Sequence, residues 1–347
     1  MPVNERNLDL TARQREILRR VVEEYVGSGQ PVASKSLVER GGLRVSSSTV
    51  RYELAELEAR GLLTHPHTSA GRVPTERGYR IYSAELLDRL EPRPSEFPLD
   101  LGGARSEFET ALQGATERLS ELTRLLALVS APPLEAATVR HVEVLLLQPR
   151  VVMVVLITST GAVSKRTFTF DDPVDPGLAK WAREYLNEQL GGLRLGTQQL
   201  RRRLEAPELS PGERDFLRVV RPVFTGLASE EQRLFVGGAA GLLDDVRTDE
   251  IGAYRRLLEL LEQRTLLLEL LRRAGEPARP FVRIGGDLGA ALEEASLVGA
   301  TYGLVNRTLG AVSLLGPVRM DYDKAIRSVR AAAHRLSRVA EDIYDEG

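Results

Sequence analysis

The segment Glu91–Pro98 constrains the fold of this chain more than any other feature, because three of its eight residues are proline. Proline fixes its own φ angle and has no amide hydrogen to donate, so a helix cannot continue through this segment. We therefore expect residues 91–100 to be a linker and a first domain to end near residue 90. The chain has 347 residues, which is enough for roughly two to three domains.

The composition is typical of a globular protein with a buried core, since 42% of the residues are hydrophobic and 28% are charged. The chain has no cysteine, which excludes disulfides, thiolate metal sites and cysteine nucleophiles and fits a reducing cytosol. The first residues lack the apolar segment of a signal peptide, and the longest apolar stretch, Val142–Ile157, is interrupted at Gln148-Pro149-Arg150. We expect a cytoplasmic protein without a membrane segment.

The first 90 residues show three short helical patterns followed by a hairpin. Residues 11–27 carry an apolar stripe at helical spacing behind a capping pair, Thr11 and Gln14. A second short helix follows, a third begins after the N-cap residue Ser46, and Thr75 caps a further helix beyond the hairpin. Three short helices and a small hairpin within about 70 residues predict a winged helix-turn-helix.

The outer face of the third helix carries the residues that we expect to contact DNA. Val50, Leu54 and Leu57 share one face at spacings of four and three residues, which predicts that they are buried. The opposite face then presents Ser47, Ser48, Arg51, Tyr52 and Ala55. A helix N-terminus attracts phosphate, and an arginine in the major groove can bind guanine through two hydrogen bonds.

From this pattern we expect the hydroxyls of Ser47 and Thr49 to contact phosphate, and Arg51 and Tyr52 to contact base edges. The alternative is a helix-turn-helix that docks protein. Residues 40–80 hold seven Lys and Arg against four Asp and Glu, a mild positive excess that gives only weak support for nucleic-acid binding.

The polar segment His65–Arg72 is expected to form the wing. A glycine-containing hairpin tip that ends in arginine suits a wing that places Arg72 along the DNA backbone or in the minor groove. His65 and His67 lie two residues apart, as metal ligands on a strand do, but no third ligand is evident near them. We therefore expect no metal site.

Beyond the linker the hydrophobic period changes. Residues 106–129 carry a heptad-like apolar stripe that predicts one long helix, packed on a domain core or in part against a partner subunit. Apolar and β-branched runs then predict three antiparallel strands, followed by a helix at 178–190. These strands are expected at 142–148, 151–158 and 163–170.

The rest of the chain is expected to return first to helices and then to strands. The elements are helices at 211–227, 230–243 and 251–273, strands at 281–284, 300–306 and 309–315, and a final helix at 322–344. We interpret this order as one sheet that is interrupted by an inserted helical domain at 191–280 and then resumed.

Three stretches of the sequence resemble the HrcA family of bacterial heat-inducible transcription repressors. They are Val45–Leu54, Pro66–Pro74 together with Gly78-Tyr79-Arg80, and Gly316–Tyr322. The leucine pattern at 257–271 is also similar, so the resemblance covers most of the chain. It implies an α+β multidomain fold with a winged helix-turn-helix at 1–90, a GAF-like α/β domain at 101–190 and 281–347, and an inserted, mainly helical dimerisation domain at 191–280.

The resemblance also implies a repressor of heat-shock (chaperone) operons. Such a protein binds an inverted-repeat operator in double-stranded DNA as a homodimer and is released on heat stress, with the chaperonin as modulator. The DNA-binding residues expected from the third helix and the wing are Ser46, Ser47, Ser48, Thr49, Arg51, Tyr52, His67, Thr68, Ser69 and Arg72. Tyr52 stands where the family usually has asparagine, so the family's base preference does not transfer to this position.

A small-molecule sensor is the second class of function, because GAF-like folds often hold a ligand against the sheet. The expected strands supply few polar groups, which favours a filled core and no cofactor. Their inward residues are Val152, Val154, Leu156, Val305 and Val312.

An enzyme is not expected, because the chain has no Gly-x-Ser-x-Gly, no Walker phosphate loop and no His-Glu-x-x-His. The glycines at Gly285, Gly286 and Gly289 lack the dinucleotide fingerprint and are interpreted as a turn. Arg319 and Asp321 are expected to hold the last helix against the sheet.

Overall fold

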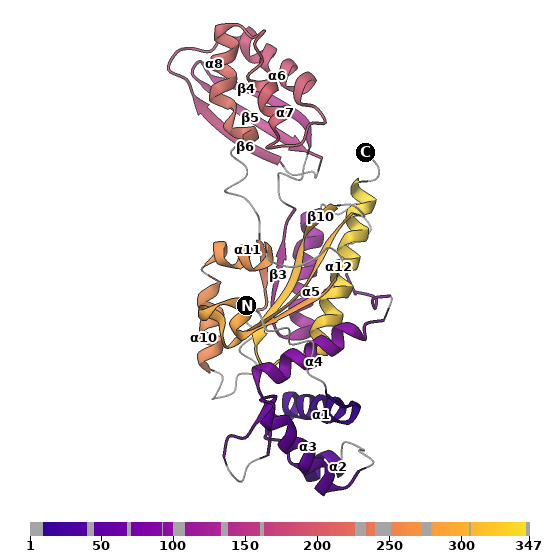
Figure 1. The fold of residues 1–347 in the computed structure, drawn as a ribbon. Helices are drawn as coiled ribbons and strands as arrows, with labels where there is room; N and C mark the ends of the chain where they lie inside the picture. The colour runs from indigo at the N-terminus through magenta and orange to yellow at the C-terminus, as the bar shows by residue number, and fades with distance from the viewer. Residues whose placement is uncertain are drawn as a thin grey trace.

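The computed structural model describes residues 10–39, 45–67, 71–91, 93–99, 108–132, 138–159, 163–225, 234–239, 251–261, 263–272, 279–304 and 307–344. These residues form three parts that follow one another along the long axis of the molecule (Figure 1). A winged helix lies at one end, a five-stranded sheet lies in the middle, and a three-stranded sheet lies at the other end.

The N-terminal part contains the helices α1 (Ala12–Ser28), α2 (Ser34–Glu39), α3 (Ser47–Ala59) and α4 (Glu76–Asp88), and the strands β1 (Leu63–Thr64) and β2 (Val73–Pro74). Thr11 and Gln14 form the predicted capping box, and Ser46 and Thr75 cap α3 and α4 as expected. Apolar side chains of these elements are fully buried against one another, among them Ile17, Leu37 and Leu57. The predicted order of elements in this part is confirmed.

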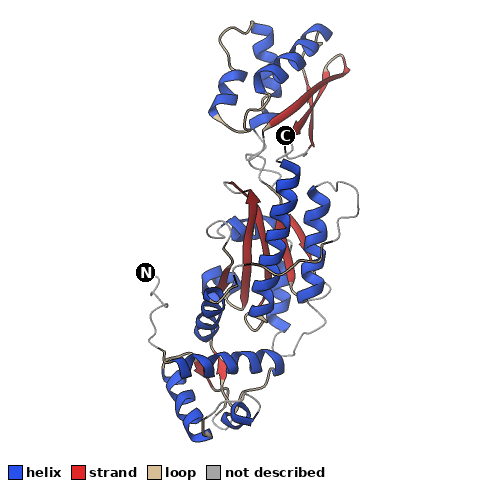
Figure 2. Cartoon of the chain, turned by 90° about the vertical axis from the view of Figure 1, so that its right-hand side faces the viewer, coloured by secondary structure: helices blue, strands red, loops and turns tan. Residues whose placement is uncertain are grey.

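The middle part is an antiparallel sheet with the strand order β7-β3-β10-β9-β8. Its strands are β3 (Leu126–Ser130), β7 (Leu234–Gly237), β8 (Phe281–Ile284), β9 (Ala295–Leu304) and β10 (Arg307–Pro317). Helices α5 (Phe108–Thr123) and α12 (Tyr322–Tyr344) lie side by side on one face (Figure 2). Helices α10 (Ile251–Leu260) and α11 (Arg264–Arg272) pack on the other face. Both faces of this sheet are therefore covered.

The third part is an antiparallel sheet with the strand order β4-β5-β6, formed by β4 (Val139–Gln148), β5 (Val151–Thr158) and β6 (Val163–Thr169). The helices α6 (Pro176–Leu190), α7 (Gln198–Leu204), α8 (Pro211–Val220) and α9 (Pro222–Thr225) accompany it. Alternate residues of β5 pack against these helices and are fully buried, namely Val152, Val154 and Leu156. The residues between them point to the opposite face of the sheet.

The predicted division of the chain after the linker is wrong. The strands at 142–170 were expected to share a sheet with the strands after residue 281, but β4, β5 and β6 form a sheet of their own. Residues 251–272, predicted as part of the insert, cover the five-stranded sheet instead. The separate unit comprises the described residues between 138 and 225 rather than 191–280, and it has a three-stranded sheet. A hydrophobic run predicts a buried strand, but it does not specify the strand with which it pairs.

The prediction of one long helix at 106–129 is also wrong, because α5 ends at Thr123 and β3 begins at Leu126. Arg124 lies between them with a φ of 57°, a left-handed conformation that ends the helix. Phe108, Leu112 and Leu119 of α5 face the core as expected, whereas Leu126 and Val129 lie on opposite faces of the sheet. Since every residue of β3 is buried, its pattern lacks the alternation that identifies a strand.

Three other predicted helices differ from the structure. The helix predicted at 211–227 is divided into α8 and α9, and the one at 251–273 is divided into α10 and α11. Within the predicted helix 230–243, the described residues 234–237 form β7, and 226–233 and 240–250 lie outside the described residues. The strands predicted at 281–284 and 309–315 and the final helix are confirmed. The linker lies against the body of the protein, where Phe97 is 8% exposed.

Candidate nucleic-acid interface

The N-terminus of α3 is held by a cluster of hydroxyl groups. The Ser46 hydroxyl accepts a hydrogen bond of 3.2 Å from the amide of Thr49, and it lies 2.8 Å from the Ser48 hydroxyl and 2.9 Å from the Thr49 hydroxyl. Ser46 and Ser48 are exposed, whereas Ser47 is half-buried with its hydroxyl 3.5 Å from that of Ser34 in α2. Ser47 therefore faces the neighbouring helix, and the exposed hydroxyls at this helix end are those of Ser46 and Ser48.

The outer face of α3 is formed by the residues that its periodicity predicts. Val50, Leu54 and Leu57 are at most 4% exposed, which fixes the opposite side of the helix toward solvent. Arg51 is exposed there, and Tyr52 is 65% exposed, which is high for an aromatic residue of this size. A cation and an aromatic ring thus project beside each other, one turn after a helix N-terminus. An arginine exposed at this position of a helix is able to reach base edges in a major groove.

The base of the wing is tied to the last turn of α3. Glu58 forms an ion pair with Arg72 at 2.7 Å and a second, very short contact with the Nδ1 atom of His65. Arg72 and Val32 also exchange two backbone hydrogen bonds of 2.8 Å. Arg72 is therefore drawn back against the protein, with its side chain 25% exposed. The structure places Arg72 between the hairpin and α3, where it holds the two together.

Glycine at position 71 is what allows this close approach. A Cβ atom there would lie 2.5 Å from the carbonyl carbon and oxygen of Val32, which no other residue could accommodate without moving the backbone. Of the remaining predicted wing contacts, His67 is exposed, and Thr68 and Ser69 lie outside the described residues.

A buried polar contact behind α3 was not predicted. Glu53 is 8% exposed, and it accepts a hydrogen bond of 3.1 Å from the side-chain amide of Gln14 and pairs with Arg13 at 3.6 Å. The contact fixes α3 against the start of α1. Gln14 was predicted only as a capping residue, yet its amide group has both a donor and an acceptor, and the capping box uses only the acceptor.

Two of the motifs that are distant in the sequence meet in the structure. The ring centroids of Tyr79 and Tyr322 lie 5.6 Å apart, and the Tyr322 hydroxyl lies 2.7 Å from both the Ser296 hydroxyl and the Val318 carbonyl oxygen. Burial raises the pKa of the Tyr322 phenol, so the hydroxyl stays protonated as a donor. These contacts join the winged helix to the five-stranded sheet through one continuous apolar cluster.

Arg319 and Asp321 have other roles than the predicted one. Arg319 donates a 3.2 Å hydrogen bond to the carbonyl oxygen of Val26, and its guanidinium lies over the ring of Tyr25. It therefore binds the end of α1. Asp321 accepts a 2.9 Å hydrogen bond from the amide of Lys324 at the start of α12, which is a capping role.

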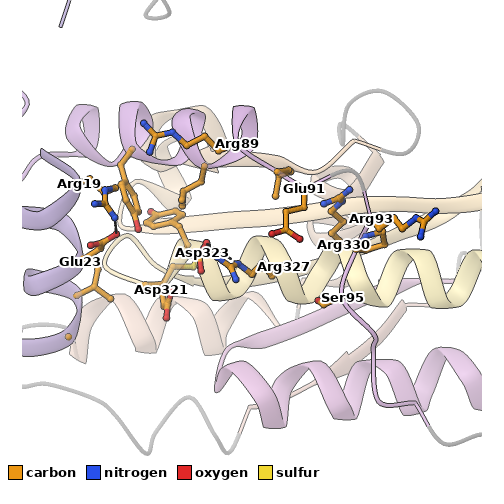
Figure 3. A pocket seen from close by; sticks show the side chains of 18 residues that line it. Arg19, Glu23, Arg89, Glu91, Arg93, Ser95, Asp321, Asp323, Arg327 and Arg330 are labelled. Atoms are coloured by element: carbon orange, nitrogen blue, oxygen red, sulfur yellow. Dashed lines mark hydrogen bonds and ion pairs between the residues drawn. The ribbon is translucent and has the colours of Figure 1, made fainter. Parts of the chain in front are cut away.

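A charged cleft of about 610 Å³ lies between α1, α4 and the start of α12 (Figure 3). Much of its charge is paired within the protein: Arg19 with Glu23 at 3.1 Å, and Arg327 with Asp323 at 3.0 Å. Tyr82 lines the cleft, and burial, reinforced by the carboxylates of Glu23, Asp323 and Asp321, raises the pKa of its phenol. Paired charges of both signs give this cleft no preference for a ligand of one charge.

The described residues give no support to a metal centre or to a ligand on the five-stranded sheet. No group of three His, Cys, Asp or Glu side chains among them is placed to hold a metal ion. The two faces of the five-stranded sheet are filled by apolar side chains of α5 and α12 on one side and of α10 and α11 on the other.

Comparisons with known proteins decide the family. A family model described as the HrcA protein C terminal domain matches residues 109–326. A heat-inducible transcription repressor HrcA from Parafrankia sp. is 36% identical, with 93% of this chain and 97% of the relative covered. Another from Nocardia farcinica is 37% identical, with 94% and 96% covered. The chain belongs to the HrcA family of heat-inducible transcription repressors.

The membership confirms the predicted family and repressor function, and HrcA is a family of repressors rather than of enzymes. A solved structure described as a hypothetical protein is 26% identical, with a TM-score of 0.63 and with 96% of this HrcA chain and 100% of that chain covered. Within the described residues, no helix has the length and apolar character needed to cross a membrane.

Proposed function

We propose that this HrcA family repressor binds an inverted-repeat operator as a homodimer, with α3 of each subunit in the major groove. The outer face of α3 carries the proposal, because Arg51 and Tyr52 are exposed beside each other while the opposite side of the helix is buried. An arginine on such a face can distinguish guanine from other bases through its N7 and O6 atoms.

We assign the exposed hydroxyls of Ser46 and Ser48, together with Thr49, to the phosphate backbone and Arg51 and Tyr52 to base edges. Ser47 supports this helix end from the α2 side.

In the wing, we assign DNA contacts to His67 and to Thr68 and Ser69, the latter two lying outside the described residues. Arg72 anchors the wing through its ion pair with Glu58. This ion pair fixes the position of the wing relative to the recognition helix.

The dimer is supported by the outer face of the β4-β5-β6 sheet. On this face Leu145 pairs with Met153, and Ile157 pairs with Val163. Leu145 is 41% exposed and Val163 is 60% exposed, and Leu147 nearby is 50% exposed. A sheet face that is apolar along β5, and that the described helices leave open, suits an isologous contact with a second copy of the chain. We therefore place the dimer contact on β4–β6 instead of on residues 191–280.

The family resemblance adds release from the operator on heat stress and modulation by the chaperonin, and we include both in the proposal. The place of action is the cytoplasm, where the operator DNA lies. Repression then follows from occupying the operator.

The experiment that tests this proposal is selection of bound sequences from random DNA with the full-length protein. We expect a palindrome whose half-sites are separated by a fixed number of base pairs, because two-fold symmetry of the protein demands two-fold symmetry of the site. An enriched site without internal symmetry would contradict the dimer, and the absence of any enriched sequence would contradict specific DNA binding.

A further inference from the structure

The first two turns of α4 are bound to the turn that follows β8. Arg80 donates a 3.0 Å hydrogen bond to the carbonyl oxygen of Ile284 and pairs with Asp287 at 3.2 Å. Glu76, one helical turn earlier, accepts a 3.2 Å hydrogen bond from the amide of Gly286 and also pairs with Arg80. Two side chains of the winged helix thus contact the backbone and side chain of one turn in the sheet domain. We refer to Glu76, Arg80 and the residues 284–287 as the clamp.

The turn is shaped to receive the Glu76 carboxylate. Gly285 has a φ of 55°, and a Cβ atom on it would lie 2.5 and 2.6 Å from the two carboxylate oxygens. Only glycine adopts this conformation easily and leaves room for the carboxylate. Asp287 is itself fixed, since it accepts a 3.3 Å hydrogen bond from the amide of Ile284. The glycine pair that resembles an incomplete nucleotide-binding motif therefore serves as a seat for the winged helix.

The clamp acts on one end of α4 only. Glu76 and Arg80 belong to its N-terminal half, whereas Tyr82, Leu86 and Arg89 further along the helix line the open cleft. The directional contacts of the clamp therefore lie at the end of α4 next to the Tyr79–Tyr322 contact, where they resist rotation of the winged helix on the sheet domain.

Rotation matters because the recognition helix and the β4–β6 sheet lie at opposite ends of the molecule (Figure 1). A rotation of about 10° displaces a point about 20 Å from its axis by about 3.5 Å, which is one base-pair step. A small angular change at the clamp is thus enough to move a recognition helix out of register with its half-site.

We propose that Arg80 and Glu76 are positioning residues for operator binding, which set the distance between the two recognition helices through the clamp. This inference rests on the proposed function, since it takes the dimer and the inverted repeat as given. The residues contact no DNA, so their effect appears only where two half-sites must be reached together.

The test measures binding of the full-length chain to the selected inverted repeat, to a single half-site, and to repeats whose spacing is changed by one and two base pairs. For Arg80→Ala we expect unchanged half-site affinity, affinity for the inverted repeat lowered by about 10-fold, and a flattened dependence on spacing. Asp287→Asn removes the same ion pair from the sheet domain without altering the winged helix, and it should act in the same direction with a smaller effect. The matched control is Arg89→Ala. Arg89 is the C-cap residue of α4, pairs with Glu85 and lies outside the clamp, so this variant should retain the wild-type spacing optimum.

Circular dichroism and light scattering on each variant confirm that it is folded and dimeric. The inference is overturned if Arg80→Ala and Asp287→Asn keep the sharp spacing optimum, or if they weaken half-site and repeat binding equally. If the wild-type protein itself shows no preference for the repeat over the half-site, the proposed function fails, and the inference fails with it. A loss of spacing dependence confined to the clamp variants supports the inference.

Discussion

The outer face of α3 and the outer face of the β4–β6 sheet are built alike but differ in chemistry. Each belongs to an element whose inner side is buried. The fully buried residues include Val50 and Leu57 on α3, and Val152 and Val154 on β5. On α3 the open side carries a guanidinium, a phenol and hydroxyls, whereas on β5 it carries only aliphatic side chains and the thioether of Met153. The comparison teaches that exposure does not distinguish the two faces, whereas their residue types do: polar and cationic groups suit DNA, and aliphatic groups suit a protein partner.

The largest expected effect comes from a charge on the sheet face. Met153→Lys places an ammonium group at the centre of β5, next to Leu145, where it would be desolvated in a dimer. We expect light scattering to show monomers, and affinity for the inverted repeat to fall to that of a half-site, by about 100-fold. Glu184→Lys, on the exposed side of α6, is the control and should stay dimeric. A dimeric Met153→Lys protein would place the interface elsewhere.

A change on α3 is expected to act on sequence recognition while leaving the dimer intact. Arg51→Ala should lower operator affinity by ~1–3 kcal/mol because the bidentate contact is lost. Arg51→Lys keeps the charge but not the planar fork, so it should restore binding to random DNA without restoring the preference for the operator. Fluorescence anisotropy on both DNAs separates these effects. An equal loss on operator and random DNA would mean that Arg51 contacts phosphate only.

A smaller effect is expected at the base of the wing. Glu58→Gln removes the carboxylate that pairs with Arg72 and His65, so the Arg72 guanidinium becomes available to phosphate. Binding to random DNA should strengthen. The difference in binding free energy between operator and random DNA should shrink by about 1 kcal/mol or less, since the wing is less firmly held. The slope of the logarithm of affinity against the logarithm of salt concentration should steepen by about 1, as expected for one additional phosphate contact. An unchanged salt slope would show that Arg72 stays withdrawn without Glu58.

The smallest expected effect concerns acid stability at the edge of the sheet face. Burial by itself raises the pKa of Glu143, but hydrogen bonds from His141 and Arg183 outweigh it, so the pKa is lowered overall. Because the pKa is lowered in the folded state, the ionised Glu143 carboxylate stabilises the fold at pH values above the ordinary glutamate pKa. This stabilisation is lost as the pH falls through the folded-state pKa. At pH 7, Glu143→Gln should therefore reduce the free energy of unfolding by about 0.5 kcal/mol or less. Denaturation at neutral and at acidic pH measures this, and a difference that persists when the carboxylate is protonated would exclude the ion pairs as its cause.

Local patterns in the sequence predicted the winged helix well. The capping residues Thr11, Ser46 and Thr75 act on groups three positions away, and the stripe of α3 depends only on helical periodicity. Arg51 and Tyr52 could be assigned to the open face for the same reason. The role of Arg72 could not, because its partners Glu58 and Val32 approach it only through the folded hairpin.

The sequence by itself determined where the helices of the winged helix begin, which of their faces are buried and to which family the chain belongs, since these depend on neighbours along the chain and on recognisable motifs. Only the tertiary structure decided which strands pair: β3 lies next to β10, about 180 positions away, whereas β4–β6 close on themselves. It also decided that Gly285 and Gly286 receive Glu76 of the winged helix. The physical reason is that strand pairing and domain contacts are fixed by packing between residues far apart in the sequence. Apolar runs of similar composition can pack against one another in several combinations, so the sequence pattern does not specify the partner.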